Sequence, residues 1–324
     1  MNESCLYTTM SIRLPVYRST IAFLYIITGI ASMVFNALII VSIWTTPSLH
    51  KPSYVLIANL AITDFIVGAV ADPSMFVVNL AALQDWESVF CSSSMIGRGS
   101  GYWMGAMSLY TLTAISVDRL LAIKLKSRYK TIVTLRKVVI NLVFWWIGTC
   151  CLLTLFKLSM TIVTIIISTY LFLLLGTLTT CYAMAYYSLK RMMSPVSPNT
   201  TRDTLPNGNT SFHAQKYRRT LNTTLLVFFT VIFFYFPYLC SLVTTAIIYK
   251  VMPNASQSGF RDFLYRFITS SELVVFVNST MNPFLYLWRM KDLSRAAKET
   301  LKRMFGCKRP VGEETLANRS VQQR

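Results

Sequence analysis

Residues 21–44, IAFLYIITGIASMVFNALIIVSIW, decide the fold class of this chain. The stretch holds no charged residue, and it exceeds the roughly 20 apolar residues that a helix needs to cross the hydrocarbon core of a bilayer. An open strand in lipid would leave its peptide groups without hydrogen bonds, whereas a helix satisfies them internally. The stretch therefore predicts a membrane-spanning helix.

Six further stretches have the same character and meet or approach the same length. They cover residues 54–83, 90–117, 138–156, 158–189, 220–249 and 267–288. They lack the alternation of apolar and polar residues that is typical of a barrel strand. The sequence thus predicts an all-α membrane protein, a bundle of seven transmembrane helices.

The overall composition excludes an ordinary soluble protein. Of the 324 residues, 54% are hydrophobic and only 14% are charged, whereas soluble domains carry about 25% charged residues. The net charge of +18 would by itself also suit a nucleic-acid-binding protein. The positions of the basic residues along the chain decide between these two interpretations.

Most basic residues follow helices one, three, five and seven. That side of the bundle holds 24 of the 31 Lys and Arg residues, and an excess of basic residues marks the cytoplasmic side. We therefore expect a multi-pass plasma-membrane protein with its N-terminus outside, without a nucleic-acid partner. Asn2 and Asn254 begin N-x-Ser/Thr sequons on the outer side and are candidate glycosylation sites. No signal peptide is apparent in residues 1–19.

The chain divides into an extracellular tail (1–20), the helix bundle (21–289) and a cytoplasmic segment (290–324). The last segment begins with apolar residues at helical spacing, flanked by Lys and Arg. The apolar positions are Leu293, Ala297, Leu301, Met304 and Phe305. This pattern predicts a short amphipathic helix on the lipid surface of the inner leaflet, with Cys307 as a candidate acylation site. The alternative is a tail helix without lipid contact.

Polar residues in the middle of the apolar stretches predict a buried site. A carboxylate in lipid is costly, and Asp64 lies in the middle of helix two. Ser108 in helix three and Asn278, Ser279 and Asn282 in helix seven lie at a similar depth. One carboxylate among neutral oxygens suits a small hard cation or a water network. A hydrogen-bonded polar cluster without an ion is the alternative.

Several motifs in order along the chain resemble those of the class A, rhodopsin-like G-protein-coupled receptors. They are Asn36, Asn59-Leu60-Ala61-Ile62-Thr63-Asp64, Asp118-Arg119-Leu120, Trp146, Pro237 and Asn282-Pro283-Phe284-Leu285-Tyr286. The resemblance runs from helix one to the amphipathic helix. It implies a receptor, not an enzyme, whose intracellular partner is a heterotrimeric G protein.

The resemblance also implies roles for individual residues. Asp64, Ser108, Asn278, Ser279 and Asn282 would form an allosteric sodium pocket, with no other cofactor expected. The activation switch would comprise Asp118, Arg119, Tyr182, Tyr235, Pro237, Pro283 and Tyr286. In it, Arg119 would leave Asp118 on activation while helix six swings outward about Pro237, where proline removes a backbone hydrogen bond.

Departures from the family pattern narrow the range of ligands and indicate how the receptor would signal. Gly101 stands where amine receptors have an aspartate, and Phe276 stands where opsins carry the retinal lysine, which argues against both ligands. Tyr235 replaces a tryptophan and adds a hydroxyl that needs a buried partner. Tyr217 stands where many receptors have an acid that restrains the arginine. We therefore expect measurable signalling without ligand.

The outer face departs from the family as well. The loop after helix four is short and has no cysteine, so Cys91 either pairs with Cys5 or remains free. The short loop resembles those of melanocortin receptors and, more loosely, of adenosine and lipid receptors.

Charged residues near the outer mouth predict a ligand site. Asp72, Arg98 and Glu272 would form a charged rim that recognises a polar or cationic group, or else an ion pair that only holds helices together. Gly101 and Gly105 on the same stripe would either make room for ligand or allow close helix packing. We expect a receptor for a peptide or a small polar molecule. The alternatives are a constitutively active receptor without ligand and an ion- or proton-coupled transporter.

Overall fold

The computed structural model describes most of the helical bundle. The described residues are 14–125, 128–153, 169–170, 172–181, 183–184, 186–187, 229–245, 247–248 and 258–306. Six residues discussed above lie outside these ranges: Asn2, Cys5, Tyr182, Tyr217, Asn254 and Cys307. Within the described ranges all regular structure is helical, as expected.

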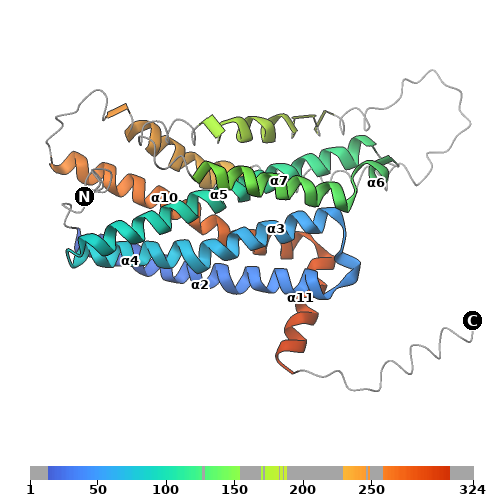
Figure 1. Cartoon of the computed structure of the whole chain (residues 1–324), viewed down its shortest axis with the longest axis horizontal. Helices are drawn as coiled ribbons and strands as arrows, with labels where there is room; N and C mark the ends of the chain where they lie inside the picture. The colour runs from blue at the N-terminus through green and yellow to red at the C-terminus, as the bar shows by residue number, and fades with distance from the viewer. Residues whose placement is uncertain are drawn as a thin grey trace, which may run out of the picture.

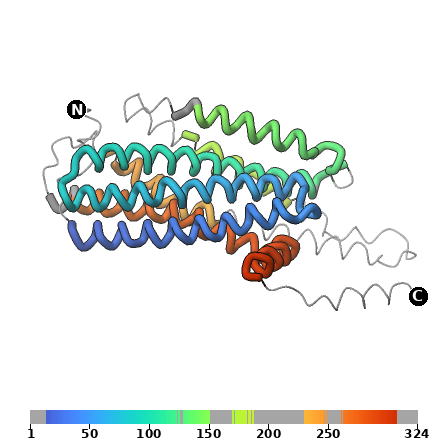
Figure 2. Tube along the Cα trace, turned by 60° about the horizontal axis from the view of Figure 1, so that its bottom comes forward, coloured from blue at the N-terminus to red at the C-terminus, as the bar shows by residue number. Residues whose placement is uncertain are grey.

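Long helices run side by side to form the bundle, as Figures 1 and 2 show. Helix one is α2 (Pro15–Thr45), followed by the short turn η1 (Pro47–Leu49). Helix three is α5 (Glu87–Leu125), and helix four is α7 (Leu135–Leu153) after the short α6 (Tyr129–Ile132). The helical segments Phe172–Cys181 and Phe229–Thr245 belong to helices five and six. Helix seven is α10 (Ser258–Arg289), and α11 (Lys291–Met304) then leaves the bundle at an angle.

Two helices are long and apolar enough, by length and composition alone, to cross a membrane. They are Pro15–Thr45 and the combined helix two, Pro52–Leu83. Helix α5 is longer than either, but polar residues such as Arg98 and Asp118 lower its apolar character. The other described helical segments of the bundle lie alongside these two (Figure 1).

Several helices extend beyond the apolar stretches that predicted them. Helix α2 begins at Pro15 instead of residue 21, so the end of the predicted tail is helical. Proline suits the first turn of a helix, because the N–H that it lacks would have no intrahelical acceptor there. Helices α5 and α10 also begin before residues 90 and 267. An apolar run marks only the length of a helix that lies within the lipid. The polar turns at its ends continue the helix beyond that run.

Helix two contains a wide turn that positions part of the site. It consists of α3 (Pro52–Ile66), the π-helical η2 (Val67–Ala71) and α4 (Asp72–Leu83). The N–H of Asp72 donates to the Val67 carbonyl, five residues back. Pro73, in the first turn of α4, has no N–H to continue the ladder. Helix two is thus distorted locally into a π-helical turn, a feature that often marks functional sites.

The apolar core forms two clusters with polar residues between them. One cluster contains Ile39, Leu60 and Tyr286, and the other contains Tyr25, Met75 and Phe276. Between them on the same helices lie buried polar residues, which are Ser32, Asn36, Thr63, Asp64, Ser108, Asn278, Ser279 and Asn282. We call this set the polar layer. The two apolar clusters shield it from solvent on both sides.

Helix α11 packs its first turns against the bundle. Leu293 and Ala297 of the predicted apolar stripe are buried, whereas Leu301, Met304 and Phe305 are exposed. The described residues therefore show a helix at the predicted place with one side against α2.

Candidate functional site

The centre of the polar layer is the carboxylate of Asp64, which is 0% exposed. Its Oδ1 accepts a hydrogen bond from the Ser108 hydroxyl (3.1 Å), and its Oδ2 accepts one from the Asn282 Nδ2 (2.8 Å). Ser279 also interacts with the carboxylate. These partners come from helices three and seven, so a single side chain links three helices.

Helix one joins the polar layer through Ser32, which the sequence did not single out, and through the motif residue Asn36. The Ser32 hydroxyl donates to the Asp64 backbone carbonyl (2.9 Å). The Asn36 Nδ2 donates to the Ser279 carbonyl (3.0 Å). The Thr63 and Ser108 hydroxyls share a hydrogen bond of 2.8 Å. Serine and threonine are common in membrane helices, so only their positions in space distinguish these residues.

Asn278 was predicted to join this network and Tyr286 to join the activation switch, but neither forms a hydrogen bond with Asp64. Asn278 is buried, but its Oδ1 has no hydrogen-bond partner in the described part of the chain, and it does not bond to Asp64. The Tyr286 hydroxyl is likewise without a partner there. Asn278 was expected to share a face with Asn282, but only Asn282 reaches the carboxylate.

A second set of hydrogen bonds ties helix two to helices three and four. The Asn59 Nδ2 donates to Thr111 Oγ1 (2.9 Å), and the Trp146 indole N–H donates to Asn59 Oδ1 (2.9 Å). Two residues of the predicted motifs, Asn59 and Trp146, are therefore direct partners. This contact fixes helix two against its neighbours beside the polar layer.

At the cytoplasmic end of helix three, Asp118 is held mainly by neutral groups. The Ser53 hydroxyl donates to its Oδ2 (2.8 Å), and the Tyr129 hydroxyl donates to its Oδ1. Burial, together with this bond to the carboxylate, raises the pKa of Tyr129, so the phenol keeps its proton. The Arg119 Nε lies 4.0 Å from Asp118 Oδ2. The predicted pair exists, but its arginine is loosely held.

At the outer end, Arg98 of α5 and Glu272 of α10 form an ion pair across the bundle. The Nε–Oε1 distance is 3.1 Å, and the Arg98 Nη2 donates to Oε2 at 3.4 Å. The Tyr102 hydroxyl donates to Oε1 (3.3 Å), and the Tyr238 hydroxyl donates to that of Tyr102 (2.8 Å). Helices seven, three and six are therefore joined by one chain of polar contacts.

Asp72 does not belong to this rim, which corrects the three-residue prediction. Its side chain packs on helix one, and neither carboxylate oxygen has a hydrogen-bond partner among the described residues. Of the two glycines on the stripe, Gly101 serves packing, since an added Cβ would lie 2.6 Å from the Phe276 ring. An added Cβ on Gly105 would meet nothing within 4 Å. Of these two glycines, only Gly105 fits the prediction that a glycine on this stripe makes room for a ligand.

Helix six places Tyr235 and Pro237 as the motif predicts but does not satisfy the tyrosine hydroxyl. Tyr235 is buried and interacts electrostatically with Asp64. No hydrogen bond of its hydroxyl is present within the described ranges, so the expectation of a buried partner is wrong there. Pro237 lies in the described helix Phe229–Thr245, and Pro283 lies inside α10.

Residues at the outer ends of helices one and seven form a further contact that the sequence did not reveal. The Arg18 guanidinium lies 4.8 Å from the centroid of the Tyr265 ring, and the Tyr17 hydroxyl shares a hydrogen bond of 2.8 Å with the Ser270 hydroxyl. Arg18, expected in the tail, is 1% exposed. The two helix ends are therefore held together beside the rim.

Cys91 is disulfide-bonded, so the alternative of a free thiol is wrong.

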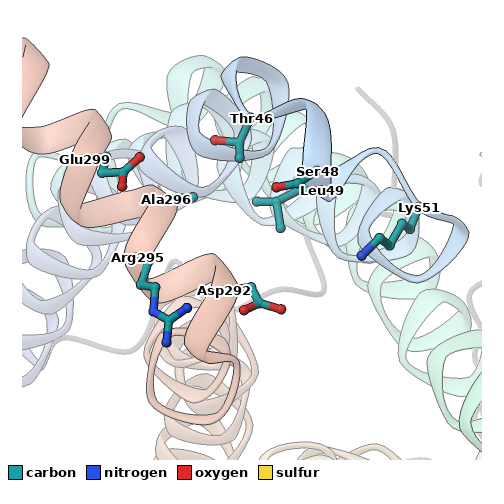
Figure 3. Close-up of a pocket in the computed structure, with 8 residues that line it drawn as sticks. All are labelled: Thr46, Ser48, Leu49, Lys51, Asp292, Arg295, Ala296 and Glu299. Carbon is teal, nitrogen blue, oxygen red and sulfur yellow. The ribbon is translucent and has the colours of Figure 1, made fainter. Parts of the chain in front are cut away.

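A cavity of about 340 Å³ lies at the opposite end of the bundle. Figure 3 shows it between the turn that follows α2 and the first turns of α11. Its lining carries both signs of charge, with Lys51 and Arg295 against Asp292 and Glu299. No preference for a ligand of one charge follows from this balance.

The described residues contain no group of three or more His, Cys, Asp or Glu side chains that could hold a metal ion. A cation at Asp64 would therefore be bound by one carboxylate and neutral oxygens, a donor set that suits sodium better than a transition metal.

Comparison with known proteins reveals a resemblance to one family over part of the chain. Residues 35–161 match the model of the seven-transmembrane receptors of the rhodopsin family. The adenosine A3 receptor of Canis lupus familiaris is 29% identical over 123 residues, which is 38% of this chain and 37% of that protein. A rhodopsin of Camponotus atriceps is 33% identical over 107 residues, covering 32% of this chain and 27% of that protein. The histamine H2 receptor of Cavia porcellus is 27% identical over 132 residues, covering 41% and 36%.

This part of the chain is therefore similar to the class A, rhodopsin-like family, a family of multi-pass membrane receptors and not of enzymes. The matched segment spans about 37% of the length of the first of these relatives. The relatives bear the names of an adenosine receptor, a rhodopsin and a histamine receptor, so they do not single out a subfamily.

Proposed function

We propose that this chain is a receptor that transmits an extracellular ligand signal to heterotrimeric G proteins. The observation that carries the proposal is the continuous set of polar contacts from the Arg98–Glu272 pair to helix six, with the polar layer beneath it. Such a set gives a ligand at one end of the bundle a physical route to the helix whose movement opens the other end. The proposed orientation has the N-terminus outside, as the basic residues predict.

The rim supplies the ligand contact in this proposal. The side chain of Arg98 is 23% exposed, whereas that of Glu272 is 2% exposed. An incoming ligand therefore meets the guanidinium first, and a polar group of the ligand competes with Glu272 for it. Weakening this pair changes the bond from Glu272 to Tyr102, and through it the bond to Tyr238 in helix six.

The response at the cytoplasmic end is an outward movement of helix six. Tyr238 directly follows Pro237, where the helix lacks a backbone hydrogen bond and bends most easily. The Arg119 guanidinium, only loosely held by Asp118, then turns to the G protein. Sodium at Asp64 would hold helices two, three and seven together and favour the resting state.

The loose hold on Arg119 also supports signalling without ligand. Asp118 is already satisfied by Ser53 and Tyr129, so releasing the arginine breaks only a weak contact. A constitutively active receptor is therefore the second candidate function. The transporter alternative gains no support from the family match.

The test is expression of the full chain in cells that report each second-messenger pathway, first without ligand and then with peptide, nucleoside, amine and lipid libraries. An agonist response that Glu272→Gln abolishes while surface expression persists would support the ligand role of the rim. Glu87→Gln is the matched control, because Glu87 is an exposed acid in the first turn of α5. Unchanged agonist potency in the Glu272 variant would contradict the role of the rim.

Signal above background without any agonist, abolished by Arg119→Ala, would support the second candidate. Background-level signal in every pathway, with and without the libraries, would contradict both functions.

A further inference from the structure

A buried carboxylate without partners lies between helices one and two. Asp72 is 0% exposed, and both of its carboxylate oxygens lack hydrogen-bond partners within the described part of the chain. Its ionised form would be very costly in such a place unless something compensates the charge. The nearby ionic residue Arg98 is committed to Glu272. The compensating group must therefore come from elsewhere.

The backbones of the two helices touch beside Asp72. An added Cβ on Gly68 would lie 2.7 Å from the Gly29 carbonyl oxygen, closer than any real side chain allows. An added Cβ on Gly29 would lie 3.1 Å from the Gly68 carbonyl oxygen and 3.4 Å from Asp72 Oδ2. The Gly68 carbonyl oxygen and a carboxylate oxygen of Asp72 therefore both lie beside Gly29, and we call this arrangement the cradle.

The Gly68 carbonyl oxygen has lost its usual hydrogen bond. In a regular α-helix it would accept the N–H of Asp72, but that N–H donates to Val67. The next residue, Pro73, has no N–H to take its place. The π-helical turn therefore leaves a backbone acceptor free at the position where helix one comes closest.

Tyr25 adds a third oxygen to the cradle. It lies one turn before Gly29 on the same face of α2. It is 0% exposed, and its hydroxyl has no hydrogen-bond partner among the described residues. The charged residues near this hydroxyl are Glu272, Arg98 and Asp72. Figures 1 and 2 show α2 running alongside α4, the helix that begins at Asp72.

These oxygens define the class of ligand. A carboxylate, a free carbonyl and a hydroxyl are hard oxygen donors, which bind small hard cations. A single negative charge matches a single positive charge. A water molecule alone would leave the carboxylate charge uncompensated in the apolar interior.

We propose that Asp72, the Gly68 carbonyl and the Tyr25 hydroxyl form a binding site for a monovalent cation, sodium, between helices one and two. Asp72 lies eight residues beyond Asp64, about 12 Å along the helix, so this site is separate from the polar layer. A bound cation neutralises the carboxylate and clamps helix one to the wide turn of helix two. The rival occupant is a proton on Asp72.

The first experiment measures the thermal melting of the purified full-length receptor in lipid nanodiscs. Melting is compared in sodium chloride and in choline chloride at constant ionic strength. Asp64→Asn removes the charge of the polar layer, so any sodium-dependent rise in Tm that remains in this variant belongs to another site. We expect a rise of a few degrees, because a ligand that binds only the folded state stabilises it.

The double variant Asp64→Asn/Asp72→Asn is expected to lose that rise. The matched control, Asp64→Asn/Asp262→Asn, neutralises a carboxylate near the start of α10 and is expected to keep it. Equal melting of Asp64→Asn in the two salts would overturn the proposal, as would a rise that persists in the Asp72 double variant. Neither readout needs an agonist or a G protein, so the result is independent of the proposed function.

A second measurement covers the case in which the double variant does not fold. Specific binding of sodium-22 to the purified Asp64→Asn receptor is expected, displaced by sodium chloride and not by choline chloride. Tyr25→Phe in the same background removes one hydroxyl and keeps the ring, and it should weaken binding several-fold. Absence of specific binding, or an infrared band of a protonated carboxyl that Asp72→Asn removes in sodium buffer, would overturn the proposal.

Discussion

Two aspartates on helix two, Asp64 and Asp72, have the same burial and opposite surroundings. Both are 0% exposed. Asp64 accepts hydrogen bonds from Ser108 and Asn282, whereas Asp72 accepts none from the described residues. Burial alone therefore does not reveal how a membrane protein compensates a carboxylate. The difference lies in the residues that the neighbouring helices place opposite each one.

The local backbone contributes to this difference. Asp64 lies in the regular helix α3, beside polar side chains of helices three and seven. Asp72 follows the π-helical turn, where the neighbour is the glycine backbone of helix one. Glycine has no side chain that could donate a hydrogen bond. The close helix contact that glycine permits thus removes the partner that a larger polar residue would have supplied.

The largest effect should come from breaking the close contact beside Asp72. Gly68→Val places side-chain atoms within 2.7 Å of the Gly29 carbonyl oxygen and 2.9 Å of Ser32 Cβ, and neither neighbour can move without separating helices one and two. We expect loss of folded receptor at the cell surface, measured by antibody labelling of intact cells.

Gly105→Val is the control for that change, because an added Cβ there meets nothing within 4 Å. It should reach the surface at wild-type level. Normal surface expression of Gly68→Val would show that the two helices do not need this contact.

An intermediate effect is expected at Asp64. Asn282→Ala removes the 2.8 Å hydrogen bond to Oδ2, and bonds to charged groups contribute about 1.5–3 kcal/mol. The variant should lower Tm in detergent or nanodiscs. Asn278→Ala removes the same side chain one turn away, where no bond to Asp64 exists, and should cost less. A larger loss for Asn278→Ala would contradict the arrangement of the polar layer.

The smallest effect should come from Asp72 when sodium is absent. Without a cation the buried carboxyl carries a proton, because an uncompensated charge there would be too costly. Asp72→Asn then exchanges one neutral group for another and removes no hydrogen bond of the described residues. In choline chloride we expect the free energy of unfolding to change by no more than about 1 kcal/mol, in either direction. Asp64→Asn under the same conditions should lower Tm more. If the Asp72 variant proved the less stable of the two in choline chloride, the contrast between the two aspartates would be wrong.

The sequence predicted much of the site because the chemistry of its residues is distinctive. Charged or amide residues in apolar stretches are rare, so Asp64, Asn282 and the Arg98–Glu272 pair were visible from their types and depths. Ser32, Thr63 and Tyr129 were missed because hydroxyl residues occur throughout these helices. Asp72 was assigned to the rim from its spacing, since an ideal helical repeat does not anticipate the π-helical turn at Val67–Ala71.

By itself, the sequence determined the helical class of the protein, the depth of its charged residues and the family motifs. These follow from composition and spacing along a single chain, because lipid admits few charges and few backbone conformations. Only the tertiary structure decided which polar groups meet. Helical periodicity gives the direction of a side chain around its own axis, but the distance to a partner depends on how closely two helices pack. Because helices one and two pack closely at Gly29 and Gly68, Asp72 faces the backbone of a glycine and no polar side chain of helix one.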